Sequence, residues 1–181
     1  MAAEFYLDRS AAREIVRSEL EQLKQRIASN IRSTGTQASG RTAASMRVEA
    51  TEEEGTLFGN APFGVLETGR RGGKIPYGFR GILLEWMRAK GVHGRPIPYV
   101  RMPSARWQPK YTPQERGDLS MAGAIAYRIS KSGSRLFRIG GRADIYSNEI
   151  PKTLESVAQR IQTLLTTAFD SIKLNDQTIG D

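Results

Sequence analysis

Cysteine is absent from the 181-residue sequence, and histidine occurs once, as His93. The absence of cysteine excludes disulfide bonds, thiolate zinc sites and a cysteine nucleophile. His93 comes shortly after a glycine that we expect to end a helix, and directly before Gly94, with no acidic or hydroxyl residue at a motif-like spacing. We therefore interpret His93 as a surface loop residue rather than a catalytic base.

Long hydrophobic runs are also missing. No segment approaches the roughly 18 apolar residues that a membrane-spanning helix needs. The first ten residues, MAAEFYLDRS, lack the basic flank and apolar core of a secretory signal. We expect a protein that is neither secreted nor embedded in a membrane, and that is assembled in a cytoplasm.

The motifs of common catalytic and nucleotide-binding sites are absent as well. There is no G-x-S-x-G nucleophile elbow, and no glycine pair has the spacing of a dinucleotide fingerprint. Gly73 and Lys74 match part of a phosphate loop, but Thr68 and Ile75 stand where glycine and Ser or Thr are required. Residues 52–54 are adjacent glutamates that point in different directions, which favours a solvated turn over a metal site. We expect no enzyme, metal or cofactor.

The length and charge of the chain limit its organisation and its partners. A chain of 181 residues suits one well-buried core and is short of two, so we expect a single α+β domain over residues 1–181. Twenty-seven Lys and Arg against 19 Asp and Glu give a formal charge of +8. This excess favours acidic partners: nucleic acid, an acidic protein face or a polyanionic lumen.

Hydrophobic periodicity predicts the helices and strands. Apolar residues at steps of three and four predict a long helix over residues 10–33 and another beginning near Asn148, with two central helices over residues 80–90 and 119–131. Alternation and turn residues predict a hairpin from residues 42–50 and 56–59, and strands over residues 63–66 and 136–139. The fold class is therefore α+β: a small antiparallel sheet packed by the long N-terminal helix, the two central helices and the long C-terminal helix.

The two long helices each carry one apolar stripe. The N-terminal stripe consists of Val16, Leu20, Leu23, Ile27 and Ile31. The C-terminal stripe consists of Ile150, Leu154, Val157, Ile161, Leu164 or Leu165, Ala168 and Ile172. The N-terminal stripe could pack on the chain's own sheet, which is the more frequent case, or on a neighbouring copy. The C-terminal stripe is a strong amphipathic signal.

Glycine and proline mark the connecting segments. Residues 33–41 and the glycine-rich residues 69–74 are expected to be flexible loops. Five of the eight prolines lie between residues 94 and 117, and such a stretch cannot be a helix or a central strand. We therefore predict an extended Pro-rich arm over residues 94–118. Residues 175–181 should fray.

Basic and aromatic residues on two of these segments are the candidate site. Arg70, Arg71 and Lys74 on the glycine-rich loop could contact phosphates, although a solvated turn would look the same. The candidates on the arm are Tyr99, Arg101, Arg106, Trp107, Lys110 and Tyr111. They could stack on bases or anchor a protein interface, and Trp107 could also belong to the core. Because prolines stiffen the arm and lower its ordering cost, we favour a protein partner.

The order of several segments resembles the neck and tail-completion proteins of long-tailed bacteriophages. After the leading helix come SGRTAASMRV (residues 39–48), APFGVLETGRRGG (61–73), ILLEWMRAKGV (82–92), AIAYRISKSG (124–133) and a closing helix. The short motifs in this order are LE-x-G, W-x-x-x-K-G and A-x-x-I-x-x-x-G. The Pro-rich arm is longer than is usual for that family.

This resemblance implies a non-enzymatic structural protein of the virion. It would form a ring of identical subunits at the head-tail junction, joining the DNA-filled head to the tail, after assembly in the bacterial host cytoplasm. Its partners would be copies of itself, neighbouring neck, connector or tail proteins, and packaged DNA through non-specific contact. Two alternatives stay open: a stand-alone nucleic-acid-binding protein that uses the basic-aromatic arm, and a hydrolase that uses His93.

Overall fold

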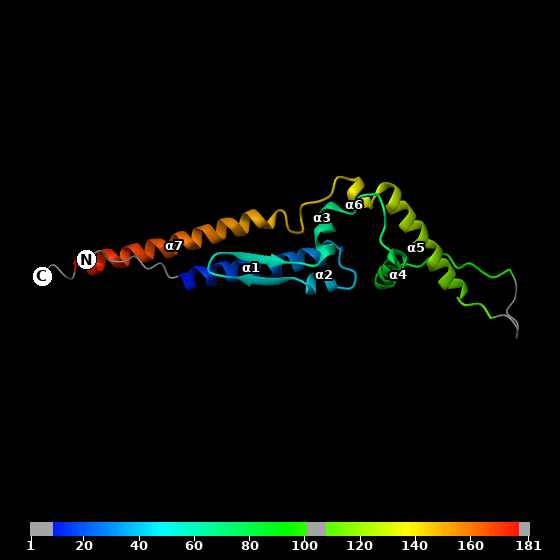
Figure 1. The fold of residues 1–181 in the computed structure, drawn as a ribbon, viewed down its shortest axis with the longest axis horizontal. Coiled ribbons are helices and arrows are strands. Elements are labelled where there is room, and N and C mark those ends of the chain that lie inside the picture. Colours follow the sequence, from blue (N-terminus) through cyan, green and yellow to red (C-terminus); the bar gives the residue numbers. More distant parts are fainter. Residues whose placement is uncertain (1–8, 101–107, 178–181) are drawn as a thin grey trace. The chain divides into compact units, whose positions relative to one another are not determined.

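The computed structural model describes residues 9–100 and 108–177. Contacts divide the chain into two compact units, where we predicted one core (Figure 1). The terminal unit comprises Met1–Gln37, Arg41–Phe63 and Ala143–Asp181, and the central unit comprises Ala38–Gly40 and Gly64–Arg142. Each unit has its own buried residues, and each is described by itself below.

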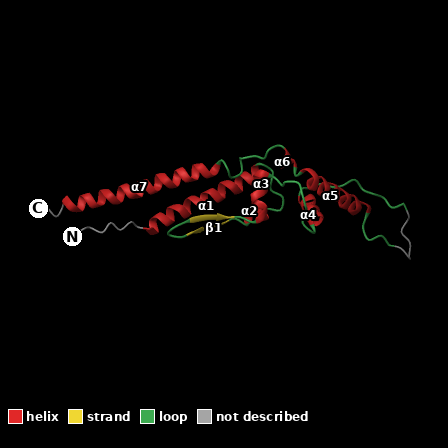
Figure 2. Ribbon diagram, turned by 45° about the horizontal axis from the view of Figure 1, so that its top comes forward, coloured by secondary structure: helices red, strands yellow, loops and turns green. Residues whose placement is uncertain are grey.

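The terminal unit is built around helix α1 (Arg9–Ser33). The hairpin strands β1 (Arg47–Ala50) and β2 (Gly55–Phe58) pair antiparallel, from Arg47 opposite Phe58 to Ala50 opposite Gly55. A short helix, α2 (Arg41–Ala44), precedes the hairpin, and the long helix α7 (Glu149–Gln177) completes the unit. Helix α1 contacts both strands and also α7, and so lies between them (Figure 2). The predicted α+β class, with a small antiparallel sheet and long N- and C-terminal helices, is confirmed.

The predicted apolar stripe of α1 faces this unit's interior. Leu23, Ile27 and Ile31 are buried, with Ile27 only 1% exposed. At the other end of the stripe, the hairpin approaches so closely that a Cβ on Gly55 would lie 2.3 Å from Val16 Cγ1. The spacing of apolar residues therefore predicted both the helix and the face that it buries.

The central unit is helical among its described residues. Its elements are α3 (Val65–Thr68), α4 (Phe79–Ala89), α5 (Pro113–Ser132) and α6 (Arg135–Arg138), and α3 follows the 3-10 turn η1 (Ala61–Gly64). Helices α4 and α5 pack on each other through Leu83, Met87, Ala122 and Ala126. The two alanines, small and almost fully buried, allow the helices to approach closely. The predicted central helices therefore exist, and they pack on each other.

Two predicted strands are wrong. Residues 63–66 form part of η1 and the start of α3, and residues 136–139 contain α6. Both are short apolar runs, which periodicity alone cannot assign to helix or strand. At α6 the decisive residue is Ser134, whose side chain accepts a hydrogen bond from the Phe137 amide and caps the helix. The predicted first hairpin strand is also shorter than expected, because its first residues form α2.

The arm is shorter than predicted because α5 begins at Pro113 rather than at residue 119. Thr112 and Glu115 form a capping box: the Glu115 amide donates to Thr112 Oγ1 over 3.1 Å, and the Thr112 amide donates to Glu115 Oε2 over 2.7 Å. Pro113 occupies the first turn, where its missing amide costs no hydrogen bond. At the other end of the chain, α7 continues to Gln177, so the first three residues of the predicted frayed tail are helical.

Candidate interaction surfaces

The described residues contain no candidate metal centre. That part of the chain has no group of three or more His, Asp or Glu side chains that could hold a metal ion. A search of the same residues finds no helix with the length and apolar content to cross a bilayer. The surfaces described below carry the basic and aromatic residues that the sequence predicted as candidate site residues.

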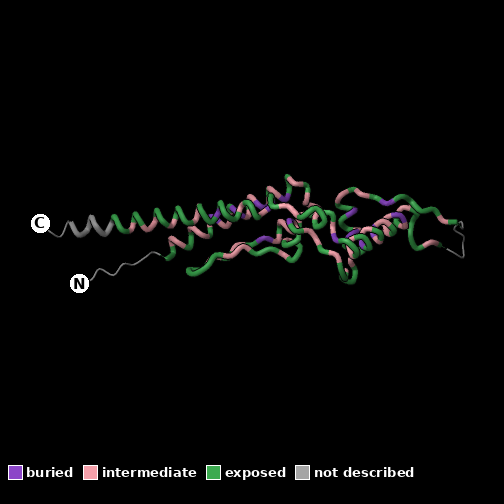
Figure 3. Tube along the Cα trace, turned by 90° about the horizontal axis from the view of Figure 1, so that it is seen from above, coloured by how far each residue is buried: buried purple, intermediate pink, exposed green. Residues whose placement is uncertain are grey.

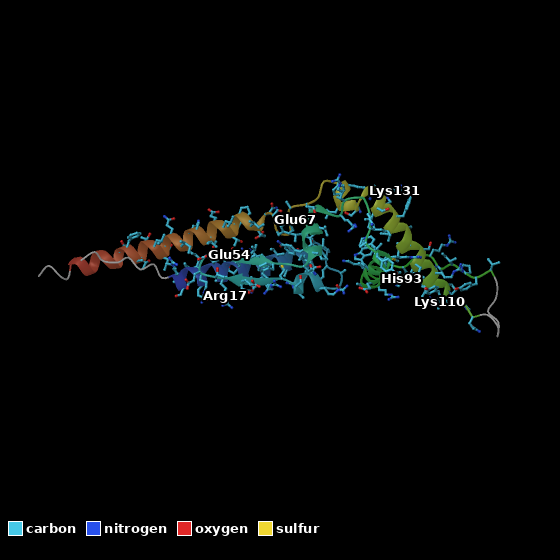
Figure 4. The ribbon with its side chains drawn as sticks, in the orientation of Figure 1. Arg17, Glu54, Glu67, His93, Lys110 and Lys131 are labelled. Atoms are coloured by element: carbon cyan, nitrogen blue, oxygen red, sulfur yellow. The ribbon has the colours of Figure 1, made fainter. Side chains whose placement is uncertain are left out.

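Asp118 fixes the start of the arm to α5. Its Oδ1 accepts hydrogen bonds from the Gly94 amide at 2.7 Å and from Gln114 Nε2 at 3.0 Å, and its Oδ2 lies 3.4 Å from His93 Nδ1. The Gly94 amide in particular, together with the bond from Gln114 and the proximity of His93, holds the pKa of Asp118 below its usual value. His93, labelled in Figure 4, is 59% exposed at its side chain. No sequence motif marks this contact, because Asp118 lies 25 residues after His93.

The backbone crosses α5 at the same place. A Cβ on Gly94 would lie 2.1 Å from the Gly117 carbonyl oxygen, and a Cβ on Gly117 would lie 2.2 Å from the Arg95 carbonyl oxygen. Only glycine permits this approach without displacement of the backbone. The arm therefore leaves the central unit from a fixed root.

Beyond Gly94, the two described limbs of the arm, residues 95–100 and 108–112, run side by side. The Ile97 amide donates to the Pro113 carbonyl over 2.9 Å, and Tyr99 Oη donates to the Tyr111 carbonyl over 2.7 Å. Arg116 supports one limb: its Nη1 donates to the carbonyls of Ile97 and Pro98, and its guanidinium lies 4.2 Å from the centre of the Tyr99 ring. The limbs line a groove of about 440 Å³. Sequence reasoning missed Arg116, because it is 17 residues after Tyr99 and inside α5.

The predicted arm residues therefore have different positions. Tyr99 is half-buried and bonded, whereas Tyr111 is 39% exposed and Lys110 is exposed, with its Nζ 5.4 Å from the Tyr111 ring centre. Figure 4 shows Lys110 near the end of one described limb. Arg101, Arg106 and Trp107 lie outside the described residues.

The glycine-rich loop is held in place rather than free. The Gly73 amide donates to the Ser130 carbonyl over 2.8 Å, and the Ser134 amide donates to the Arg70 carbonyl over 2.8 Å. Gly69 has a φ of +69°, and a Cβ there would lie 2.4 Å from the Phe137 amide nitrogen. The loop therefore packs against the chain between α5 and α6. These contacts indicate a loop that is held in place, where we expected a flexible one.

The three basic residues of this loop do not form one patch of free cations. Arg70 is half-buried, donates from Nη2 to the Lys74 carbonyl over 3.1 Å, and lies 5.1 Å from the centre of the Phe79 ring. Arg71 and Lys74 are exposed. Arg70 thus stabilises the loop, and Arg71 and Lys74 are the side chains available to an anion.

In the terminal unit, α7 turns a polar edge toward α1. Arg26 Nη2 donates to Thr153 Oγ1 over 2.8 Å, Arg26 Nε lies 3.1 Å from Glu149 Oε2, and Arg160 Nη1 donates to Glu19 Oε1 over 2.9 Å. The hydrogen bond from Lys152 is the main cause that holds the pKa of Glu149 below its usual value, and the positive charges of Lys152 and Arg26 add to it. Hydrogen bonds and ion pairs therefore join α1 to α7 along this edge.

The apolar stripe of α7 is consequently left incompletely covered. Residues 149, 153 and 160 point about 90° away from the stripe on a helical wheel. Ile150, Leu154 and Phe169 are 43%, 64% and 53% exposed. In Figure 3 most of α7 is coloured exposed or intermediate. We call this partly covered stripe the α7 ridge, consisting of Ile150, Leu154, Val157, Ile161, Leu165 and Ala168. Ile150 and Leu154 are exposed, the other four are half-buried, and Phe169 is not part of the ridge.

The net charge is divided unequally between the units. The central segment Gly64–Arg142 contains 16 Lys and Arg but only 4 Asp and Glu, a formal charge of +12. The remaining residues contain 11 basic and 15 acidic residues, a formal charge of −4. The overall value of +8 therefore conceals one strongly basic unit and one mildly acidic unit.

Comparison of the chain with protein-family models, with curated proteins and with solved structures finds no match.

Proposed function

We propose that this protein is a non-enzymatic structural component of a tailed bacteriophage, forming a ring of identical subunits that joins the head to the tail. The order of sequence segments described above motivates the family. The observation that carries the proposal is the opposite charge of the two units, +12 for Gly64–Arg142 and −4 for the rest.

Opposite charges on two parts of one chain favour contact between copies. When a basic surface of one copy meets an acidic surface of the next, the contact joins two different patches, and such contacts close into rings if the rotation between copies allows it. The exposed glutamates of residues 52–54, at the hairpin turn, provide acidic side chains on the terminal unit. The α7 ridge provides apolar area that a neighbour would cover.

Quantitative mass spectrometry of purified particles tests this role. We expect the chain in mature virions at a low, fixed copy number relative to the major capsid protein. Deletion of the gene should leave filled heads and tails unjoined, or tails of faulty length. Infectious particles of normal yield and composition without the protein would refute the proposal.

A variant separates copy-to-copy contact from loss of folding. Changing Glu52, Glu53 and Glu54 to lysine removes the acidic turn at exposed positions. We expect this variant to fold but to fail to complement the deletion. Glu52→Gln, Glu53→Gln and Glu54→Gln together remove the charge without reversing it, and should complement in part. Full complementation by the lysine variant would exclude this turn from the assembly contact.

The alternative is a stand-alone nucleic-acid-binding protein, and the +12 charge of Gly64–Arg142 is the observation that favours it. Such a protein would bind DNA with an affinity that falls steeply as salt rises, because bound Lys and Arg release counterions from phosphates. Arg71→Glu, Lys74→Glu and Lys110→Glu should then each reduce the salt slope by about one. Absent or salt-insensitive binding to duplex and single strands would remove this alternative.

A further inference from the structure

An open apolar groove of about 630 Å³ lies on the central unit, between α4, α5 and the start of α6. Its floor is formed by Trp86, Met121, Ala124, Ile125 and Ile129. Trp86 shares α4 with the buried residues Leu83 and Met87 but is 41% exposed, and Ile82, one turn earlier, is 55% exposed. Helix α4 therefore leaves part of its apolar face uncovered, and Trp86 is the residue of that face that lines the groove.

Three arginines line this groove. They are Arg128 on α5 and Arg135 and Arg138 on α6. All three are exposed, and none of their guanidinium groups has an ion pair or hydrogen bond with another described residue. No carboxylate lines the groove. Its charge is therefore of one sign and uncompensated, while its floor is apolar.

The groove has the length for about two turns of a helix. Its α5 wall extends from Met121 to Ile129, eight residue steps, or about 12 Å at 1.5 Å per residue. A partner helix that fits would place apolar side chains on the floor at steps of three and four, and carboxylates at its edges toward the arginines. This pattern describes an acidic amphipathic helix.

The described part of this chain does not itself supply such a helix. The turn at residues 52–54 is acidic but has no large apolar side chain. The α7 ridge is apolar, but its flanking charges are mixed, with Lys152 and Arg160 among Glu149 and Glu155. Charge complementarity therefore favours a different protein over a second copy.

We propose that this groove binds an acidic amphipathic helix of another protein, with apolar anchors over Trp86 and Ile125 and carboxylates paired with Arg128, Arg135 and Arg138. This goes beyond the proposed function, because it is a property of the groove whichever role the protein has in the particle. Its test uses purified protein and model peptides, so that its failure is distinguishable from absence of the chain from virions.

Trp86 provides the readout. The chain has two tryptophans, so Trp107→Phe leaves Trp86 as the only one. The probe is a peptide of about 18 residues, long enough to form helix in water, with leucines at helical spacing and glutamate and alanine elsewhere. Matched probes replace glutamate by lysine, or scatter the same residues so that no apolar face forms. We expect the acidic amphipathic peptide to shift Trp86 emission to shorter wavelength on binding, and the other two to bind at least about tenfold more weakly.

Charge reversal tests the arginines. Arg128→Glu, Arg135→Glu and Arg138→Glu together should abolish binding of the acidic peptide and allow the lysine peptide to bind. The matched control is Arg71→Glu, Lys74→Glu and Lys110→Glu, which changes the net charge equally at exposed positions that do not line the groove. This control should retain the acidic peptide within about threefold, the residual effect of long-range charge. Circular dichroism confirms that both variants are folded.

Three outcomes would overturn the proposal: equal binding of the acidic and lysine peptides, equal binding of the scattered peptide, or equal loss of affinity in the two triple variants. The first would leave a groove without charge preference. The second and third would leave general attraction of acids to a +12 unit, without a site.

Discussion

The ion pair between α1 and α7 allows a quantitative test of how the terminal unit is held together. Glu19 is only 4% exposed, and its Oε1 lies 2.9 Å from Arg160 Nη1. The Arg160 side chain is 43% exposed. Arg160→Met keeps the length of the side-chain stem and removes the charge, so that the Glu19 carboxylate loses its cation while remaining buried.

Removal of one partner from a fully buried pair costs about 3–5 kcal/mol, because a charge is left without compensation. Here the arginine is nearly half-exposed, so water can reach the carboxylate when Arg160 is replaced, and part of the pair is already screened. We therefore expect Arg160→Met to lower the free energy of unfolding of the terminal unit by about 1–3 kcal/mol.

Urea unfolding followed by circular dichroism measures this loss, and a double-mutant cycle assigns it. Glu19→Leu removes the buried charge, so Glu19→Leu with Arg160→Met should recover stability to within about 1 kcal/mol of the wild type. Additive single effects, or a cost of Arg160→Met below about 0.5 kcal/mol, would show that the pair does not couple α1 to α7.

Three further predictions concern the division into units, the root of the arm and acid stability. Ile27→Ala and Met87→Ala should each lower the free energy of unfolding by about 2–5 kcal/mol. If the units unfold separately, Trp86 fluorescence will report the loss of stability only for Met87→Ala. An equal shift of the unfolding midpoint for both variants would indicate one cooperative unit. Gly94→Ala places a Cβ 2.1 Å from the Gly117 carbonyl oxygen, so hydrogen exchange along residues 94–99 should accelerate, and unchanged protection would mean that the crossing adjusts freely. The partners of Asp118 lower its pKa, so the ionised carboxylate stabilises the folded protein fully above the unfolded pKa near 3.8. This stabilisation is lost as pH falls through the lower folded pKa. Asp118→Asn should flatten this part of the acid-stability profile, and an unaltered profile would contradict the role of the carboxylate.

The sequence by itself determined the existence of the long helices and the C-terminal ends of α4 and α5. In α1 the apolar spacing identifies the buried face, with Leu23, Ile27 and Ile31 inside as predicted. Gly91 and Gly133 follow the ends of α4 and α5 as expected. These features are local: a 3.6-residue period and a glycine just past a helix end act within a few residues, so they can be recognised without knowledge of the rest of the chain.

Some information was present in the sequence but was outweighed by other signals. The start of α5 is marked by the capping residues Thr112 and Glu115 and by Pro113 in the first turn. The density of prolines nevertheless favoured the prediction of an extended arm up to residue 118. Ser134 is likewise a cap before a short apolar run that was interpreted as a strand. In both cases a capping residue determined the structure, because it satisfies backbone amides that the alternative would leave unpaired.

Only the tertiary structure decided how distant residues meet and which surfaces stay uncovered. The contact of Asp118 with Gly94 and the stacking of Arg116 on Tyr99 join residues 17 to 24 positions apart, with no local pattern to mark them. An amphipathic stripe shows that a helix has an apolar face, but not what covers it. On α7 the ridge stays partly exposed beside the ion pairs with α1, and on α4 Trp86 lines the floor of an open groove. Burial depends on every neighbour at once, and that is a property of the folded chain rather than of any segment.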